Sequence, residues 1–509
     1  MTPPAAVTLD GRSLTIDDVV AVADGRAPVA LAPEAADRMA RLRGVVDALV
    51  ARGEVAYGVT TGFGKLSDVA IPPERLAELQ LNLVRSHAAG VGSPLPEREV
   101  RAMMLLRANV LATGHGGGRA LLVERLAAML NAGLWPRVPE QGSVGASGDL
   151  APLAHLATTL VGEGELWHDG RFVPAARALA AHGLAPLELA PKEGLTLING
   201  TQAHTAVTAL ALAEAWRLWH TAHVAAAMTL DGLLGTPDAW DARIHEVRGQ
   251  DGQQASAALL RALAEGSAIR ESHRDGDPRV QDAYALRCVP QVHGPVLDAL
   301  RFCTGLVARE LNAATDNPLV FEDGTLRSGG NFHGQAVAMA ADVLAIALTN
   351  LANMSERRID RLVHPDLNQG LPPFLSPDAG AHSGFMMAQV TAAALASECK
   401  TLCMPASVDT IPTDGSKEDV VPMAMGAALK LRRVVHNVRH VLAVELMCGA
   451  QALDCRAPLT PGPLVADAHR RIRARVAPLT RDRILSGDIA ALAQAVGDGQ
   501  FASLGPRIA

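Results

Sequence analysis

Long stretches in which apolar residues recur at helical spacing constrain the fold of this chain more than any other feature. They are rich in Ala, Leu, Met, Arg and Glu, which are good helix formers. Strand-like sequence is sparse, and we expect one short hairpin over residues 165–173 that turns at Asp169-Gly170. Helices are predicted over residues 99–112, 119–132, 201–230, 291–315, 334–355, 383–401 and 420–453.

This pattern predicts a mainly α fold with two domains. Residues 1–200 are expected to form a loop-rich N-terminal domain, and residues 201–509 a central and C-terminal helical bundle. A chain of 509 residues, of which 49% are hydrophobic, is long enough for more than one core. Because such long helices usually bury a remaining apolar face in an oligomer, we also expect association between copies of the chain.

Composition argues against several kinds of partner. The net charge is −7, so neither nucleic acid nor an anionic membrane is expected to bind. The N-terminus lacks the basic start and long apolar core of a signal peptide. The most apolar stretch, residues 336–351, is interrupted by Asp342, and we expect a buried helix there rather than a membrane span.

The cysteines indicate a reducing compartment. There are six, without clustered spacing, which favours reduced thiols, a cytoplasmic location and no metal site. Cys399 and Cys403 lie four residues apart on a helix-like run, but no second pair of ligands accompanies them. We expect them to be buried thiols.

The segment from Gly142 to Leu153 contains the most informative triplet, Ala146-Ser147-Gly148. Because Gly148 has no side chain, its amide nitrogen can approach the carbonyl carbon of Ala146 in a backbone shape that other residues resist. If that nitrogen attacks that carbon and two waters are lost, the triplet becomes a five-membered ring. The β-carbon of Ser147 would then be an exposed electrophilic methylene, and none of the twenty side chains is a good electrophile.

Other interpretations of this region are open on sequence grounds. A bare Ala-Ser-Gly is most often a turn, and Asp149 followed by Pro152 is typical of a helix start with an acidic cap. A serine nucleophile needs the frame Gly-x-Ser-x-Gly, which neither Ser143 nor Ser147 has. The run from His115 to Gly118 could form an oxyanion or phosphate loop, but it lacks the residues that would make either specific.

The stretch from Gly142 to His155 resembles the aromatic amino-acid ammonia-lyases, and the resemblance extends over roughly residues 14–492. That family makes an internal methylidene-imidazolone (MIO) from Ala-Ser-Gly. The resemblance therefore implies that Ala146, Ser147 and Gly148 form MIO here and that no diffusible cofactor or metal is required. It also implies an ammonia-lyase/fumarase-like fold and a homotetramer whose active sites are shared between subunits.

Tyr57 opens the second motif, Tyr-Gly-Val-Thr-Thr-Gly-Phe-Gly, whose glycines suit a mobile lid. The resemblance implies that Tyr57 is the acid/base that takes a β-proton. An ordinary phenol has a pKa of about 10, so nearby positive charge or a helix N-terminus is expected to lower it. On its own, Tyr57 would more simply be a packed loop aromatic.

Gln281, Tyr284 and Arg287 form a third motif, and their spacing can align them on one helical face. The planar fork of arginine fits a carboxylate with two parallel hydrogen bonds. The resemblance implies that Arg287 binds the substrate carboxylate and that Tyr284, a catalytic residue, and Gln281 lie around the ring system. A surface arginine and a core tyrosine are the simpler alternative.

Asn199 and Phe332 lie in two further motifs, Leu-Ile-Asn-Gly-Thr-Gln and Ser-Gly-Gly-Asn-Phe-His-Gly. The resemblance implies that Asn199 polarises the MIO carbonyl, which gains negative charge when an amine adds. It implies that Phe332 forms a wall of the pocket. An Asn-Gly turn and a loop phenylalanine are the structural alternatives.

Ser86-His87 is the pair that best discriminates between substrates. Family members acting on tyrosine resemble His-Leu here and those acting on phenylalanine Phe-Leu, whereas those acting on histidine have Ser-His. Glu418 favours histidine as well, because a carboxylate can accept a hydrogen bond from an imidazole N–H and would stay unpaired against a phenyl ring. Lys417 departs from the more usual Gln or Asn, and Met386 could pack on the imidazole or in the core.

The resemblance thus implies elimination of ammonia from L-histidine to give urocanate, the first step of histidine degradation. The nearest alternative is the same fold acting on tyrosine or phenylalanine, or a 2,3-aminomutase that adds the ammonia back. A non-catalytic helical scaffold or binding protein is an alternative from a different class, and a serine hydrolase is a third.

Overall fold

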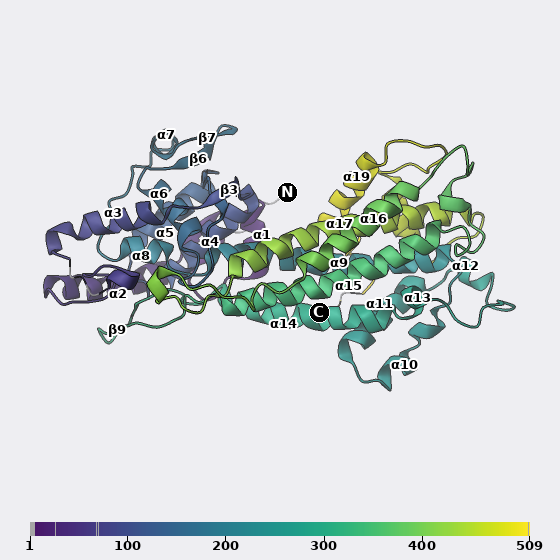
Figure 1. Cartoon of the computed structure of the whole chain (residues 1–509), viewed down its shortest axis with the longest axis horizontal. Coiled ribbons are helices and arrows are strands. Elements are labelled where there is room, and N and C mark those ends of the chain that lie inside the picture. The colour runs from purple at the N-terminus through teal and green to yellow at the C-terminus, as the bar shows by residue number, and fades with distance from the viewer. Residues whose placement is uncertain (1–5, 26, 68, 70, 507, 509) are drawn as a thin grey trace. The chain divides into compact units, whose positions relative to one another are not determined.

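The computed structural model describes residues 6–506 and 508, apart from residues 26, 68 and 70. The chain divides into two compact units, each assembled from three segments (Figure 1). Unit 1 comprises Met1–Ala213, Thr304–Asp342 and Pro405–Leu429. Unit 2 comprises Glu214–Cys303, Val343–Met404 and Lys430–Ala509.

Helices dominate both units, as the sequence predicts. The helices are α1 (Ile16–Ala23), α2 (Pro33–Ala51), α3 (Leu76–His87), α4 (Glu97–Ala112), α5 (Ala120–Asn131), α6 (Leu150–Leu160), α7 (Ala175–Ala181), α8 (Glu193–Ile198), α9 (Gln202–Gly232), α10 (Ala242–Glu246), α11 (Asp251–Ala264), α12 (Ala268–Glu271), α13 (Tyr284–Arg287), α14 (Val289–Glu310), α15 (Gln335–Val363), α16 (Met386–Leu402), α17 (Ala424–Cys455), α18 (Pro463–Arg473) and α19 (Ser486–Gly497). The mainly α fold and all seven predicted helical runs are confirmed.

The strands are short. They are β1 (Val7–Leu9), β2 (Val29–Leu31), β3 (Val91–Pro94), β4 (Trp135–Pro136), β5 (Pro139–Gln141), β6 (Glu165–His168), β7 (Arg171–Pro174), β8 (Leu319–Val320) and β9 (Leu326–Arg327). The predicted hairpin is β6–β7, which pairs Glu165 with Pro174. Asp169 and Gly170 both have positive φ, as a tight hairpin turn requires.

Two helix clusters form unit 1 and bring the motifs together. Helix α4 is almost entirely buried and packs against α1 and α5, which explains its lack of an exposed face. Helices α3, α6 and α8 pack on one another. Because His87 ends α3, Gly148 precedes α6 and Asn199 follows α8, this packing places all three motifs in one region.

The long helices of unit 2 lie side by side as a bundle (Figure 1). Arg358 on α15 and Glu445 on α17 form a fully buried ion pair, and Thr229 on α9 donates a hydrogen bond to the same carboxylate. One helix, α15, is long and apolar enough to cross a membrane, but 67% of its apolar window is buried inside the protein. The predicted buried helix over 336–351 is therefore confirmed, and Asp342 within it is itself buried.

Candidate active site

The backbone at the end of Ala146-Ser147-Gly148 packs directly against the backbone of Gly200. Gly148 has φ +71°, and a Cβ added there would lie 2.1 Å from the carbonyl oxygen of Gly200. The backbone N–H of Asp149 donates to that same oxygen at 2.7 Å. Position 148 therefore accepts no side chain, both because its conformation is left-handed and because the Gly200 backbone fills the space.

Asn199 is bonded directly to the triplet. Its Nδ2 donates to the backbone oxygen of Ser147 at 2.8 Å, while its Oδ1 is buried without a hydrogen-bond partner among the described residues. Arg107, buried on α4, donates from both terminal nitrogens to the Asn199 carbonyl at 2.9 and 3.0 Å. Burial lowers the pKa of Arg107 to about 10, and the carboxylates of Asp316 and Asp149 oppose that shift.

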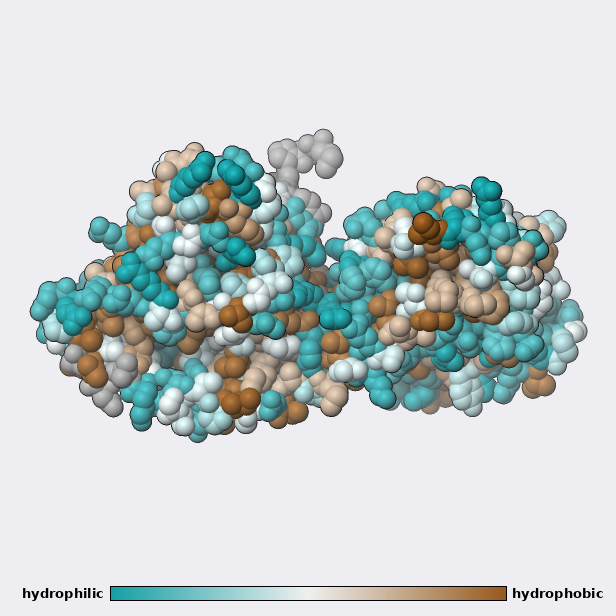
Figure 2. Space-filling view, turned by 45° about the horizontal axis from the view of Figure 1, so that its top comes forward, coloured by the Kyte–Doolittle hydropathy of each residue, from teal (hydrophilic) through white to brown (hydrophobic). Residues whose placement is uncertain are grey.

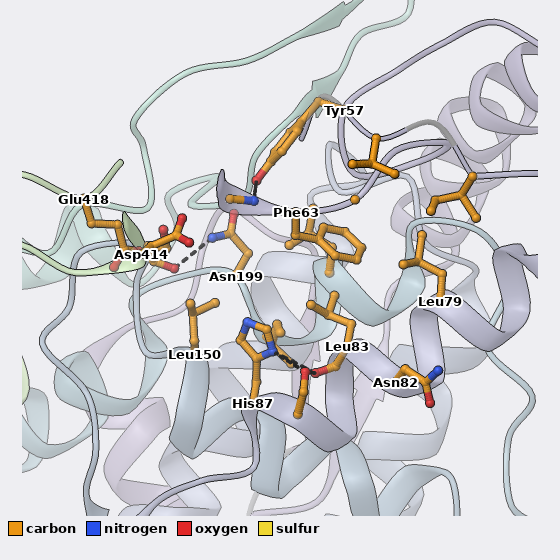
Figure 3. A pocket seen from close by; sticks show the side chains of 18 residues that line it. Tyr57, Phe63, Leu79, Asn82, Leu83, His87, Leu150, Asn199, Asp414 and Glu418 are labelled. Carbon is orange, nitrogen blue, oxygen red and sulfur yellow. Dashed lines mark hydrogen bonds between the residues drawn. The ribbon is translucent and has the colours of Figure 1, made fainter. Parts of the chain in front are cut away.

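Two adjoining cavities open beside Ser147. The larger has a volume of about 670 Å³, and most of its wall is apolar (Figure 3). The second, of about 620 Å³, shares Tyr57, Ser147 and Glu418 with the first. The larger is lined by Tyr57, Gly62, Phe63, Gly64, Val69, Ile71, Leu79, Asn82, Leu83, Ser86, His87, Ser147, Leu150, Leu195, Ile198, Asn199, Asp414 and Glu418. The second adds Ala146, Phe332 and Lys417 among others.

His87 faces the larger cavity from the end of α3 (Figure 3). Its Nδ1 lies 2.9 Å from the carbonyl oxygen of Leu83 and 3.0 Å from Oγ of Ser86. A carbonyl oxygen only accepts, so Nδ1 carries the proton, and in the neutral ring Nε2 is the acceptor. Nε2 has no partner among the described residues, which leaves it available to a donor in the cavity.

Glu418 reaches both cavities from the loop that precedes α17. Its Oε2 accepts a short hydrogen bond from Oγ1 of Thr413, which leaves Oε1 open. Lys417 is exposed and makes no ion pair with Glu418 in the described part of the chain. Lys417, where Gln or Asn is more usual, therefore does not pair with the Glu418 carboxylate.

Tyr57 lines both cavities, and Figure 3 shows its hydroxyl directed toward the loop that contains Gly64. The backbone N–H of Gly64 donates to that hydroxyl at 3.3 Å. Burial raises the pKa of Tyr57, and Asp414, Glu418 and Asp316 raise it further, while the Gly64 N–H lowers it. The expected lowering by positive charge or a helix N-terminus is not found among the described residues, where the charged groups that shift the pKa of Tyr57 are carboxylates.

Asp149 takes the position before α6, as predicted, but it does not cap that helix. Its Oδ1 accepts from Oγ of Ser143 at 2.6 Å, and its Oδ2 accepts from the backbone N–H of His204 at 2.9 Å. The carboxylate thus satisfies an N–H in the first turn of α9. Asp149 thus binds the N-terminus of α9 instead of that of α6, and sequence spacing does not predict that the two are close.

Gln281, Tyr284 and Arg287 lie in unit 2 and line neither cavity. Gln281 precedes the four-residue helix α13, so only Tyr284 and Arg287 share its face. The guanidinium carbon of Arg287 stacks 4.6 Å from the centre of the Tyr284 ring, and Tyr284 is 68% exposed. Met386, the first residue of α16, also lies in unit 2 and outside both cavities.

Several residues that support the site have no distinct sequence signal. Arg107 contacts Asn199 from α4, His204 contacts Asp149 from α9, and Asp414 lies against Gly64 from the segment before α17. Ser143 lies within the motif itself, but its bond to Asp149 depends on the folded turn. Arg107 is the one charged residue of the stretch 102–112 of α4, and an isolated charge of that kind is the one pattern that could have indicated such a contact.

Comparisons with known proteins show the family to which the sequence is similar. The sequence profile of the aromatic amino acid lyase family matches residues 14–474. Histidine ammonia-lyase of Anaeromyxobacter dehalogenans (strain 2CP-C) is 57% identical over 96% of this chain and 98% of its own length. Histidine ammonia-lyase of Koribacter versatilis (strain Ellin345) is 52% identical over 98% of this chain and 99% of its own length.

Solved structures share the fold closely. Histidine ammonia-lyase from Trypanosoma cruzi superposes with a TM-score of 0.91 at 42% identity, covering 98% of this chain and 94% of that one. Tyrosine aminomutase from Streptomyces globisporus superposes with a TM-score of 0.93 at 39% identity, covering 98% of both chains. Fold similarity alone therefore does not separate these two activities, and the side chains in the cavity must do so.

Proposed function

This chain belongs to the aromatic amino acid lyase family and is a carbon–nitrogen lyase, and from that premise we propose that it eliminates ammonia from L-histidine to give urocanate, the first step of histidine degradation. The observation that carries the proposal is the pair of polar groups in the cavity beside Ser147. His87 presents Nε2 and Glu418 presents Oε1, and both can accept a hydrogen bond. A neutral imidazole offers an N–H donor to one of these acceptors, whereas a phenyl ring would leave both unpaired.

We propose that Ala146-Ser147-Gly148 cyclises to MIO, and the residues present fit that group. Position 148 needs glycine, because the Gly200 backbone leaves no room for a Cβ. The ring would contain the carbonyl of Ser147, whose oxygen accepts from Asn199. An N–H donor on that oxygen stabilises negative charge there. When formed, MIO supplies an electrophilic methylene at the β-carbon of Ser147.

The remaining groups would bind and deprotonate the substrate. Tyr57 takes the β-proton, and the Gly64 N–H on its oxygen stabilises the phenolate. Phe332 forms a wall of the second cavity, which contains Ala146 and Ser147. Arg287 binds the substrate carboxylate, with Gln281 and the catalytic Tyr284 around the ring system.

Because those last three residues line neither cavity, we propose that another subunit of a homotetramer supplies them. Exposed apolar side chains on the long helices support association, and Figure 2 shows apolar patches interrupting the hydrophilic surface on the face in view. The exposed apolar side chains on the long helices include Phe302 on α14, Met339 and Ile346 on α15, and Met387 and Val390 on α16. The composition supports a cytoplasmic enzyme that binds neither nucleic acid nor membrane.

The geometry gives no support to a serine hydrolase. A serine nucleophile needs a base within hydrogen-bond reach. Ser143 donates to Asp149 instead, and among the described residues no histidine nitrogen is bonded to Ser143 or Ser147. An aminomutase is not separated by the site, because it shares the elimination step.

An ultraviolet assay that offers histidine, tyrosine and phenylalanine separately tests the proposal. We expect urocanate from histidine, no β-amino acid, and a mass for the purified chain that is lower than the sequence mass by two waters. Ser147→Ala cannot form the methylene, so its activity should fall by several orders of magnitude while the helical fold survives. A parent that prefers tyrosine would move the protein to another branch of the family, and an unmodified, inactive parent would favour the scaffold alternative.

A further inference from the structure

A buried histidine lies next to the Ala146-Ser147-Gly148 segment and takes no part in the proposed elimination. His204 is the third residue of α9, and its side chain is fully buried. Its Nδ1 lies 2.8 Å from Oδ2 of Asp149, which is also fully buried. The carboxylate lies off the direction of the ring N–H, so this is a close polar contact rather than an aligned hydrogen bond. Nε2 has no hydrogen-bond partner among the described residues.

Asp149 connects His204 to the turn before the triplet. Its two oxygens accept from the His204 backbone N–H and from Oγ of Ser143. Ser143 Oγ accepts in turn from the backbone N–H of Gly145 at 3.2 Å. Burial raises the pKa of Asp149, but the charge of His204 and the hydrogen bonds from His204 and Ser143 outweigh it and hold the pKa below its usual range. A continuous set of contacts therefore runs from His204 to the residue that precedes Ala146.

The imidazole of His204 also packs against the residues that hold this turn. A Cβ added to Gly334 would lie 2.8 Å from His204 Nε2 and 3.0 Å from the Cβ of Ala424. The backbone N–H of Gly334 donates to the carbonyl of Gly145 at 3.0 Å. Replacing the imidazole would thus disturb both the charge contact with Asp149 and the packing on Gly334.

We propose that His204 is a positioning residue for ring closure, acting through Asp149 and Ser143 to hold the turn that brings the Gly148 nitrogen to the Ala146 carbonyl carbon. The inference rests on the proposed formation of MIO. In that closure the lone pair of the Gly148 nitrogen forms a bond to the Ala146 carbon. The Ala146 oxygen leaves as water with the amide hydrogens of Gly148 and Ser147. A second water takes the hydroxyl and α-hydrogen of Ser147, so no oxidant or further reactant is needed.

Timed intact-mass measurement on freshly synthesised full-length chain tests this role. The fraction of chains lighter by two waters is followed with time, alongside the melting temperature. His204→Leu fills similar space without ring nitrogens, and we expect its half-time for water loss to lengthen roughly tenfold, the effect of losing one charged contact. His204→Asn places an amide nitrogen as far from Cα as Nδ1, so it should restore most of the rate. His204→Gln places its amide beyond that position and should restore less.

A second buried histidine supplies the matched control. His293 on α14 is also fully buried, and both of its nitrogens lack a hydrogen-bond partner among the described residues. His293→Leu should lower the melting temperature without slowing water loss. Ring closure in His204→Leu at the parent rate, or equal slowing in His293→Leu, would overturn the proposal. If the Leu variant does not fold, equal rates for His204→Asn and His204→Gln would overturn it instead. A parent that never loses two waters would contradict the proposed function and not this role alone.

Discussion

At the scale of single residues, most of the groups that shift the pKa of the Tyr57 phenol oppose its ionisation. Burial raises its pKa, and Asp414 is the first of the carboxylates that raise it further. Asp414→Asn removes that charge and keeps an oxygen for the Lys65 N–H, which now lies 3.3 Å from Oδ1. We expect the pKa of Tyr57 to fall. If Tyr57 is the base, the rise of kcat/KM with increasing pH should therefore occur at lower pH.

The pH dependence of kcat/KM for histidine measures this shift. Asp409→Asn is the control, because Asp409 is an exposed carboxylate that lines neither cavity. Its profile should overlay that of the parent. Tyr57→Phe should lower kcat strongly at every pH. An unmoved profile in Asp414→Asn would show that ionisation of Tyr57 does not limit the rate.

Glu418 is expected to select the substrate. One of its oxygens is occupied by Thr413 and the other is open to the cavity. Glu418→Gln removes the charge with little change in size, so kcat/KM for histidine should fall about ten- to a hundredfold, the value of a charged hydrogen bond of about 1.5–3 kcal/mol. Any phenylalanine activity should change little. Asp419→Asn, at the edge of the second cavity only, is the matched control. Equal losses on all substrates in Glu418→Gln would mean that Glu418 does not bind the ring.

Within unit 1, the site residues that sequence motifs predict lie together around Ser147. The residues that support them could not be predicted from the sequence. Tyr57, His87, Asn199 and Glu418 line one cavity because local motifs shape the loops and helix ends that carry them. The contact from His204 to Asp149 spans 55 positions in the chain and exists only once α6 and α9 have packed. Supporting side chains occur at no characteristic spacing in the sequence, because tertiary packing determines which residues they contact.

At the scale of whole elements, helix type was predictable and helix ends were not. The apolar spacing that predicts a helix to residue 315 continues beyond Glu310, where α14 ends. Conversely, α15 extends through a charged stretch to Val363, because Arg358 there finds Glu445 in the bundle interior. A buried partner can keep a polar segment helical, and that partner lies on a different helix. The local apolar spacing therefore predicts that a helix forms, whereas tertiary contacts determine where it ends.

Buried histidines on these helices make stability depend on pH. His223 on α9 is fully buried, with Nδ1 against the carbonyl of Trp219 and Nε2 2.7 Å from Oγ of Ser256. Burial lowers its pKa from 6.5 to about 3, and that of His293 also falls well below 6.5. Below pH 6.5 the unfolded chain binds protons that the folded chain does not. The free energy of unfolding should therefore be highest above pH 6.5 and decline as the pH falls toward 3.

Urea denaturation between about pH 7 and pH 4 measures this decline. His223→Gln removes one titrating group, so its free energy of unfolding should be lower than the parent's at pH 7 but should fall less steeply with acid. His182→Gln, at an exposed position on the surface, should keep the parent's slope. A slope in His223→Gln equal to that of the parent would show that other groups cause the acid sensitivity.

At the scale of the whole molecule, the domain boundary near residue 200 remains a prediction. The two compact units are each assembled from segments far apart in the sequence. The division falls within α9, α14, α15 and α17, so each of these helices contributes residues to both units. Sequence composition changes little along such a helix, and no linker marks where one unit ends. The apolar periodicity of the sequence therefore predicts the helices, but it does not predict how their residues are divided between the two units.

The proposed sharing of sites between subunits has a direct consequence for mixtures of inactive variants. Tyr57 lines the cavity beside Ser147, whereas Arg287 lines neither cavity of its own chain. If Arg287 serves the site of a neighbouring subunit, a hybrid of Tyr57→Phe and Arg287→Ala chains contains some sites with both residues intact. Coexpression of the two variants should then restore a substantial fraction of the parent's histidine activity, although each variant alone has little.

Coexpression of Tyr57→Phe with Ser147→Ala is the control, because these two residues line one cavity of a single chain. Hybrids of that pair contain no site with both residues intact and should gain nothing. Size-exclusion chromatography with light scattering would verify that hybrids and parent have the mass of a tetramer. Restoration in neither mixture would contradict the sharing of Arg287 between subunits, because a site complete within one chain and a site without Arg287 both predict no gain. Those two cases differ in Arg287→Lys, which should raise KM and lower kcat only if the guanidinium grips the substrate carboxylate.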